Sequence, residues 1–329
     1  MTRLAHNGPM SALSTVLDPL RHTAGYARYF LNKSARDRED AQALRELEAR
    51  PLTLPAGLEL EWLGTAGYRM TYEGATLLVD PFLTRVPLST VVRRRTALPD
   101  PASIDRFLPG LGDVSGIVVG HGHWDHALDA PELARRFGCP VYGSRSVRNL
   151  MALHGLGDRG VEVEPYRRYE LGPFTVTFVP SVHSKIPFGT RIPSPGDTSC
   201  ESLAALAPMA YGCGQTWGIH IAVAGIEIYH QGSADLIDDA IRHRDVDIFL
   251  AGVAGRSVTP DYWHRILTRL RPATVVPMHY DDFLRPLDAP MGFTVDIALA
   301  AVPDEIGAVS RAIDVVALPA LSPREPDAR

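Results

Sequence analysis

Three histidines and an aspartate fall within six consecutive residues in the first half of the chain. The segment reads His121-Gly-His123-Trp124-Asp125-His126. Imidazole nitrogens and carboxylate oxygens are the ligands that hold zinc and similar divalent ions. On an extended segment residues i and i+2 point to one side, so His121 and His123 can grip one ion. A turn at Trp124 then directs Asp125 and His126 toward a second ion. The alternative is a loop that is polar by chance, but chance does not explain why three histidines and an aspartate lie so close together. The segment therefore predicts a metal centre.

Two further histidines each follow a predicted strand. His183 comes just after an expected strand over Phe174–Val179, and His279 just after one over Thr274–Pro277. A lone histidine is more often an ordinary surface or core residue. Two at equivalent strand ends are what a metal site at one edge of a sheet sandwich requires, so both are predicted ligands.

Short apolar strands and helices alternate from Leu58 onward and predict an α/β fold. Hairpin strands come first, strand–helix alternation follows, and the same order then repeats. Two sheets packed between layers of helices are therefore expected. The predicted strands include Tyr68–Tyr72, Thr76–Val79, Ile117–Val119, Trp217–Val223, Ile226–His230 and Ile248–Ala251. The predicted helices include Ala130–Phe137, Ser146–His154 and Asp261–Leu270.

The first 55 residues differ from the rest and predict an N-terminal helical arm (1–55) ahead of a catalytic domain (56–329). Ala35–Arg50 is charged and helical in pattern, and Pro51 and Pro55 end that pattern. Ser11–Leu31 is mildly amphipathic. The arm is expected to pack on the main domain or on a second subunit of a homo-oligomer. A membrane-surface or lid role for its apolar residues is the alternative.

Two proline-rich stretches are expected to be loops. One runs from Pro87 to Pro109, and the other, Ser184–Tyr211, lies within a predicted lid insertion at 184–216. Long loops inside compact domains are often lids or binding loops. A surface insertion without a role at the site is the other interpretation.

Composition excludes several classes of protein. The chain has 329 residues, 45% of them hydrophobic, and a net charge of −5, so no overall basic field exists to bind nucleic acid. No run approaches the roughly 20 apolar residues that span a bilayer. Cys139, Cys200 and Cys213 form no C-x-x-C pair, which argues against a disulfide framework. A cytoplasmic protein in a reducing compartment is expected.

At these residues the chain resembles the metallo-β-lactamase superfamily, whose H-x-H-x-D-H motif matches 121–126. His183 matches the third histidine of the family's first metal site, and His279 the late histidine of the second. The branch that holds ascorbate-phosphate lactonase and the N-acylethanolamine-releasing phospholipase D is similar at three further places. These are Gly64-Thr65-Ala66, Leu77–Phe82 and Pro277–Tyr280.

The resemblance implies a four-layer αβ/βα sandwich of two mixed sheets flanked by helices, and two divalent ions. Zinc is expected, with manganese or iron as alternatives. His121, His123 and His183 would hold one ion. The other would be held by Asp125, His126, His279 and, as the shared bridging anion, Asp235. Asp125 and His279 are the predicted catalytic residues, with Asp125 orienting or deprotonating the attacking water.

One departure from the family concerns that bridge. The superfamily usually carries Gly-Asp after a late strand, whereas this chain has Gly232-Ser233 and its next carboxylate is Asp235. We expect a different backbone path to bring Asp235 to the metals. An absent bridge, with a single metal or a weak second site, is the alternative. Asp80 is either a turn residue before Pro81 or the anchor of a ligand histidine.

Two divalent ions close together activate water for hydrolysis, so an ester, lactone, amide or phosphodiester is the expected target, in a small-molecule or lipid-like substrate. An iron-dependent oxygenase and a non-catalytic metal-binding protein are the alternatives. Ser184 and Lys185 are expected near the substrate. Arg93–Arg95 and Arg191 are either anion ligands or solvated loop charges. Aromatic residues weighed as pocket walls are Tyr68, Trp124, Tyr211, Trp217 and Tyr280.

Overall fold

Two sheets form the centre of the computed structural model, which describes residues 32–186 and 190–321. The first sheet has six strands in the order β1 to β6, and the second has seven in the order β13-β12-β11-β10-β9-β8-β7. The first sheet contains β1(Glu59–Gly64), β2(Gly67–Tyr72), β3(Ala75–Val79), β4(Asp113–Val118), β5(Val141–Gly143) and β6(Gly160–Glu162). The second contains β7(Arg168–Leu171), β8(Phe174–Ser181), β9(Thr216–Val223), β10(Ile226–Gln231), β11(Ile248–Gly252), β12(Thr274–Met278) and β13(Asp314–Val315).

Both sheets are mixed and are built in the same order. Each begins with antiparallel neighbours, β1 to β3 in one and β7 to β10 in the other. Each then continues with parallel neighbours, β3 to β6 and β10 to β13. Parallel pairing needs crossover connections, which explains why strand–helix alternation follows the hairpins in each half.

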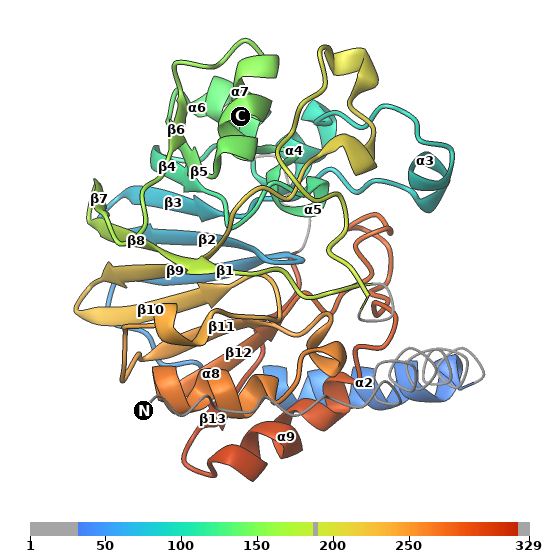
Figure 1. Ribbon diagram of the computed structural model, residues 1–329. Helices are drawn as coiled ribbons and strands as arrows, with labels where there is room; N and C mark the ends of the chain where they lie inside the picture. Colours follow the sequence, from blue (N-terminus) through green and yellow to red (C-terminus); the bar gives the residue numbers. More distant parts are fainter. Residues whose placement is uncertain (1–31, 187–189, 322–329) are drawn as a thin grey trace, which may run out of the picture.

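Helices cover the outer face of each sheet and complete four layers (Figure 1). The helices are α2(Lys33–Glu48), α3(Leu88–Val92), α4(Pro101–Phe107), α5(Trp124–Ala127), α6(Ala130–Phe137), α7(Arg145–Leu153), α8(Tyr262–Leu270) and α9(Val302–Val309). In Figure 1, α4, α6 and α7 lie above the first sheet, and α2, α8 and α9 below the second. The predicted four-layer sandwich is confirmed. Among the described helices none is long and apolar enough to cross a membrane.

Alternating side chains of the strands divide the core into two parts. On β3, Leu77 and Val79 belong to the larger cluster, together with Phe178 of β8; this cluster also reaches α8 and α9. Leu78, between them in sequence, points the other way and packs with Leu150 of α7 in the outer cluster. This is the two-residue period of a strand buried on both faces.

Helix α2 lies on the second sheet's side of the molecule and is tied to its core. Leu44 and Leu47 are buried in the larger core cluster, which also contains residues of α8 and α9. Buried Asp40 accepts a hydrogen bond from Ala300 N at 2.9 Å. The helix expected over Ala35–Arg50 is therefore present. The amphipathic segment Ser11–Leu31 lies outside the described residues, and the division of the chain at residue 55 stays a prediction.

Replacement of Leu47 by alanine tests whether α2 supports the fold and not the metal centre. Leu47 is 1% exposed, so Leu47→Ala should lower the free energy of unfolding by about 2–4 kcal/mol. Metal content per folded chain should not change. Chemical denaturation and plasma mass spectrometry measure the two quantities. Glu39→Ala, on the exposed face of the same helix, should change stability by less than about 0.5 kcal/mol. Loss of metal in Leu47→Ala but not in Glu39→Ala would show that α2 supports the metal centre.

The two expected loops contain short helices. Between Pro87 and Pro109 the chain forms α3 and α4, and Asp100 caps α4 by accepting from Ala102 N, with Pro101 in the first turn. An Asp-Pro start is a helix signal that the proline content concealed. The stretch after His183 contains two 3-10 turns, Leu203–Ala205 and Pro208–Ala210. Its role as a lid stays a prediction.

Candidate metal centre

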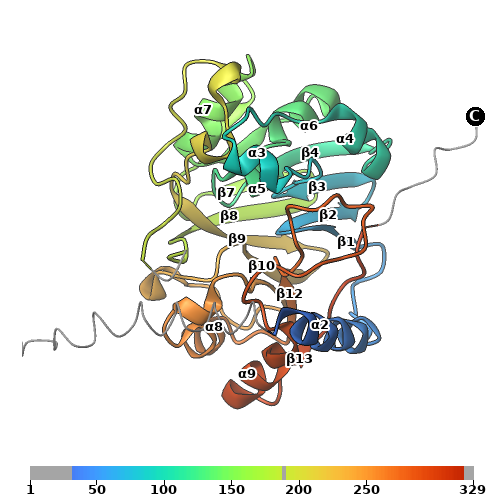
Figure 2. The same ribbon diagram turned by 90° about the vertical axis from the view of Figure 1, so that its right-hand side faces the viewer.

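Segments that are distant in sequence bring the predicted ligands to one edge of the sandwich. His121 and His123 lie on the loop after β4, and α5 begins directly after them. His183 follows β8, and His279 follows β12. Figure 2 looks onto this edge, where α3 and α5 lie beside the ends of the strands. The ligand atoms form two groups, and within each group all atoms lie within 4.8 Å of one another. These are His121, His123 and His183 in one group, and Asp125, His126 and His279 in the other.

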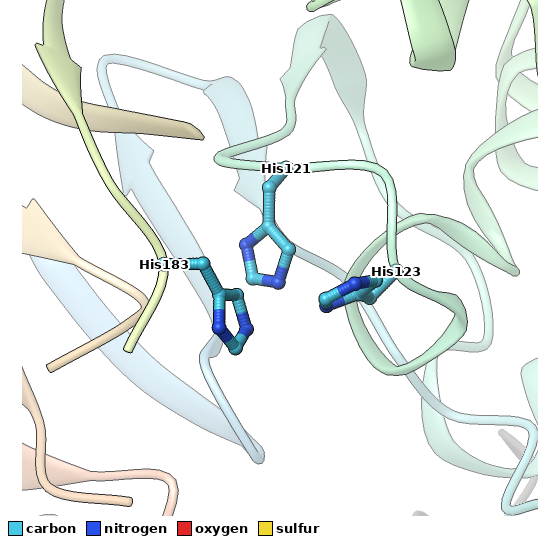
Figure 3. A group of neighbouring side chains, drawn as sticks. All are labelled: His121, His123 and His183. Atoms are coloured by element: carbon cyan, nitrogen blue, oxygen red, sulfur yellow. The ribbon is translucent and has the colours of Figure 1, made fainter. Parts of the chain in front are cut away.

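The first group is a nearly regular triangle of imidazoles. Ring centroids of His121, His123 and His183 are 4.7–4.8 Å apart, and the rings face a common point (Figure 3). His123 Nε2 lies 2.9 Å from Pro193 O, and His183 Nδ1 lies 2.7 Å from Ser184 O. Each contact fixes one ring nitrogen as the donor and leaves the other, Nδ1 of His123 and Nε2 of His183, free to bind a metal.

Buried His121 provides the clearest sign of a missing partner. Both its ring nitrogens are buried, and neither has a hydrogen-bond partner among the described residues. A buried polar atom without a partner is costly unless something else occupies the position. Burial, with the neighbouring histidines, also holds the pKa of His121 well below its ordinary value and lowers that of His183 to about 3. Neutral imidazole is the form that binds metal, so the donor set fits a divalent ion.

The second group surrounds the carboxylate of Asp125. Asp125 Oδ2 lies 3.2 Å from His279 Nε2 and 3.7 Å from His126 Nε2. Burial alone would raise the pKa of Asp125, but His126 and His279 outweigh it and hold the pKa below its ordinary value. The ring centroids of His121 and His126 are 3.9 Å apart. The two groups are therefore immediate neighbours, and Asp125 is the one carboxylate within them over residues 32–186 and 190–321.

Asp80, at the end of β3, anchors the second group from behind. Its Oδ2 accepts from His126 Nδ1 at 2.7 Å, and its Oδ1 accepts from Gly120 N at 2.6 Å. Asp80 is fully buried, and together with Asp125 it raises the pKa of His126 against the effect of burial. Of the two interpretations of Asp80, a turn residue or the anchor of a ligand histidine, the structure supports the second, because its carboxylate contacts His126. The space behind it is tight, since a Cβ on Gly232 would lie 3.0 Å from Asp80 Oδ2.

His279 is held through its backbone by the turn between β1 and β2. It has a left-handed φ of 61°, and its N donates to Thr65 O at 2.8 Å. Thr65 N in turn donates to Asp281 Oδ1, and Arg85 pairs with the same carboxylate at 2.9 Å. Strained backbone of this kind persists where its surroundings fix it. Neither Arg85 nor Asp281 could be predicted from a motif, and only the position of Asp281, two residues after His279, points toward the site.

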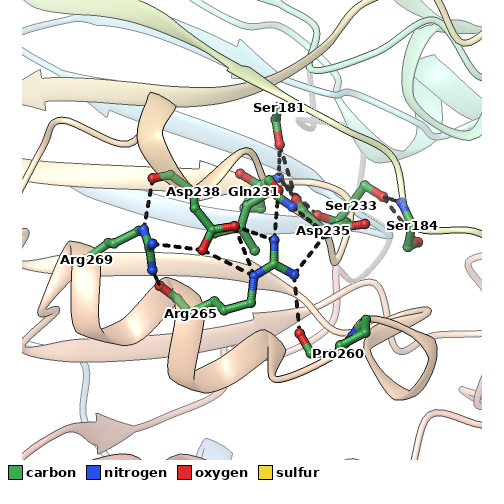
Figure 4. A network of polar contacts seen from close by, with 10 residues as sticks. Ser181, Ser184, Gln231, Ser233, Asp235, Asp238, Pro260, Arg265 and Arg269 are labelled. Atoms are coloured by element: carbon green, nitrogen blue, oxygen red, sulfur yellow. Dashed lines mark hydrogen bonds and ion pairs between the residues drawn. The ribbon is translucent and has the colours of Figure 1, made fainter. Parts of the chain in front are cut away.

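Asp235, the predicted bridge between the metals, lies with neither ligand group among the described residues. Asp235 Oδ1 accepts from Leu236 N at 2.8 Å and pairs with Arg265 of α8 at 3.4 Å, so the side chain faces α8 (Figure 4). Gln231 causes this path, because its Nε2 donates to Ser233 O and Asp235 O and holds the loop after β10 closed. Ser233 Oγ accepts from Ser184 N at 3.0 Å. The residue after Gly232 therefore supports the segment that carries His183.

Neutralisation of Asp235 should leave the metal centre intact. Asp235→Asn keeps the acceptor for Leu236 N and weakens only a partly exposed ion pair with Arg265, which is worth about 0–1 kcal/mol. We expect the same number of bound ions per chain as in the parent protein, measured by plasma mass spectrometry after gel filtration. A loss of one ion would restore Asp235 as a ligand.

The residues predicted to contact the substrate fall into those that line the cavity and those that do not. Trp124 and Ser184 line the cavity in front of the ligands, whereas Lys185, Arg191 and Arg93–Arg95 are exposed and do not line it. The other aromatic candidates are buried in the core, and they are Tyr68, Tyr211, Trp217 and Tyr280. His230 also belongs to the core, where its Nε2 lies 2.8 Å from Ala66 O.

Comparison with known families identifies the superfamily of the chain. The model of the beta-lactamase superfamily domain matches residues 59–279, which include all six clustered ligands. The chain belongs to the β-lactamase superfamily. Two relatives of the chain are called UPF0173 metal-dependent hydrolases. The one from Cereibacter sphaeroides is 31% identical over 235 residues, with 69% of this chain and 87% of the relative covered. The one from Polynucleobacter asymbioticus is 29% identical, with coverages of 68% and 74%.

Two solved structures share the superfamily fold. Igni18, a metallo hydrolase from Ignicoccus hospitalis, gives a TM-score of 0.50 at 20% identity and covers 81% of this chain and 97% of its own. CmlA, a diiron β-hydroxylase from Streptomyces venezuelae, gives 0.51 at 14% identity, with coverages of 84% and 55%. At these identities the likeness concerns the fold alone. With the relatives above and the paired ligand groups, the chain is a metal-dependent hydrolase of the β-lactamase superfamily.

Proposed function

We propose that this hydrolase binds two divalent ions, with zinc as the native metal, and cleaves an ester, lactone or phosphodiester bond. One observation carries the proposal: two adjacent groups of buried ligand atoms open onto a single cavity of about 370 Å³. Members of both groups line that cavity, and these are His123, Asp125, His183 and His279. Five imidazoles with one carboxylate form a nitrogen-rich donor set that suits zinc better than magnesium or calcium.

The division of work among the residues follows from their contacts. Divalent ions bound in these groups would lower the pKa of a bound water molecule and would polarise the oxygen of the scissile bond. Asp125, whose carboxylate stays ionised, lies at the cavity wall and can accept the proton of the attacking water. His279, 3.2 Å from it, orients that carboxylate. Asp80 contacts His126 and Gly120 N but does not line the cavity, and it is a positioning residue.

Two metals without a carboxylate bridge from the protein should be held unequally. Three neutral imidazoles form the first group, whereas Asp125 joins two imidazoles in the second. Asp235 pairs with Arg265 and would not add a carboxylate to either group. We propose that the two sites load independently and with different affinities.

Metal removal and reconstitution test the proposal directly. Protein purified without chelator should contain about two zinc ions by plasma mass spectrometry. Its hydrolysis of p-nitrophenyl acetate or bis(p-nitrophenyl) phosphate should disappear on chelation and return with zinc. Equal activity of the metal-free protein would contradict the proposal. Stoichiometric iron together with oxygen consumption would replace it with an oxygenase.

A further inference from the structure

The wall of the ligand-lined cavity is mostly apolar. Resting on the hydrolase function proposed above, we propose that the substrate is an uncharged carboxylic ester or lactone whose acyl group is an apolar chain. Members of both ligand groups line the cavity together with apolar side chains from separate segments. Those side chains are Val91, Ile186, Met209, Phe283, Leu284 and Val295. Four hydroxyl side chains, Ser184, Ser194, Ser233 and Thr294, also line the cavity.

Charge argues against an anionic substrate group away from the reacting bond. No lysine or arginine lines the cavity among residues 32–186 and 190–321, and residues 187–189 read Pro-Phe-Gly. A carboxylate placed against these walls would lose its hydration without gaining a counter-charge. A phosphodiester would likewise find no arginine fork for the oxygens that the metals leave unbound. Of the three bonds proposed, the carboxylic ester and the lactone alone are uncharged.

The mouth of the cavity continues the apolar surface outward. Met209 and Val295 line the cavity and are 50% and 37% exposed. Met209 belongs to the Pro208–Ala210 turn, which contacts α3. On α3, next to the lining residue Val91, Leu88 and Val92 are 57% and 71% exposed. Large side chains of this kind around an opening often mark a binding surface. A chain longer than the cavity would continue over this rim.

The reaction is a simple hydrolysis with no further reactant. The oxygen of water forms a bond to the acyl carbon, and the bond from that carbon to the alkoxy oxygen breaks. One proton of the water passes to the leaving alkoxide. An ester gives a carboxylic acid and an alcohol, and a lactone gives a single hydroxy acid.

A graded series of chromogenic esters tests the acyl group on the zinc-loaded, full-length protein. We expect kcat/KM to rise about threefold per added methylene from p-nitrophenyl acetate through butyrate to octanoate, which corresponds to partial burial of each group. p-Nitrophenyl hemisuccinate replaces the terminal methyl of the butyrate ester with a carboxylate. The kcat/KM of the protein for this ester should be at least about 100-fold lower than for the butyrate ester. Bis(p-nitrophenyl) phosphate should be a poorer substrate than octanoate.

A pair of variants ties the preference to the wall. Met209→Glu should lower kcat/KM for octanoate about tenfold or more, whereas Met209→Leu, which keeps the volume, should stay within about threefold. Ile237→Glu is the matched control, because Ile237 is 40% exposed and does not line the cavity. It should leave the octanoate rate and the metal content unchanged.

The outcomes separate this inference from the function on which it rests. Zinc-dependent turnover with equal rates on acetate and octanoate, or a preference for hemisuccinate or the phosphodiester, would overturn the apolar acyl substrate and keep the hydrolase. Absence of zinc-dependent turnover on every probe would overturn both. Octanoate turnover that Met209→Glu leaves untouched would show that the wall does not bind the chain.

Discussion

His121→Ala should abolish binding of the first metal ion and lower zinc-dependent hydrolysis by at least about 1,000-fold, a barrier increase of about 4 kcal/mol. The imidazole belongs to the first group and lies beside the second, with its ring centroid 4.7 Å from that of His123 and 3.9 Å from that of His126. Its removal leaves two ligands, which is too few for a protein zinc site. Plasma mass spectrometry and the ester assay measure the two effects.

Stability measurements distinguish loss of the metal from loss of the fold. His121 makes no hydrogen bond among the described residues that the substitution would break. The metal-free variant should therefore unfold within a few degrees of the metal-free parent, whereas added zinc should raise the Tm of the parent far more. His264→Ala, at an exposed position on α8, is the control and should bind and react normally. Full activity without metal in His121→Ala would refute the metal centre.

Asp80→Asn should weaken the second metal site about 10- to 100-fold and reduce stability by about 1–3 kcal/mol. The carboxylate accepts from two buried donors, Gly120 N and His126 Nδ1. An asparagine has one acceptor oxygen, so in either orientation its amide nitrogen faces one of those donors. If it faces His126, the imidazole proton is driven to Nε2, the nitrogen that must bind the ion.

Titration with zinc reveals this effect in a way that a purely structural defect would not. Activity of Asp80→Asn should be low at limiting zinc and should recover at high zinc, while the first ion stays bound. Asp113→Asn, an exposed residue at the start of β4, should behave like the parent. Unchanged zinc affinity in Asp80→Asn would show that the contact with His126 does not affect metal binding.

The ligands could be predicted from the sequence because they lie where chain periodicity and strand ends are easy to read. His121, His123, Asp125 and His126 follow one apolar strand within six residues, and the structure gathers them. His183 and His279 needed only the ends of two further strands. Even the anchor Asp80 was a candidate, since a carboxylate at a strand end often meets a ligand ring.

Contacts made by the backbone and by loops could not be predicted. Pro193 O and Ser184 O orient two ligand rings, and a carbonyl oxygen carries no signature of its own. Asp235 was misplaced because counting residues after Gly232 does not reveal that the Gln231 amide closes the loop and turns the side chain toward Arg265. The path of a short loop depends on which polar groups find partners, and many sequences satisfy the same spacing.

The ligand groups draw on both sheets, and this arrangement has a kinetic consequence. His121 to His126 follow a strand of the first sheet, whereas His183 and His279 follow strands of the second. Neither half alone contains a complete set, so we expect the ions to bind only after the two halves have docked, late in folding. Interactions absent from the folding transition state slow unfolding and leave the folding rate nearly unchanged. Bound ions would therefore prolong the lifetime of the native chain without guiding its assembly.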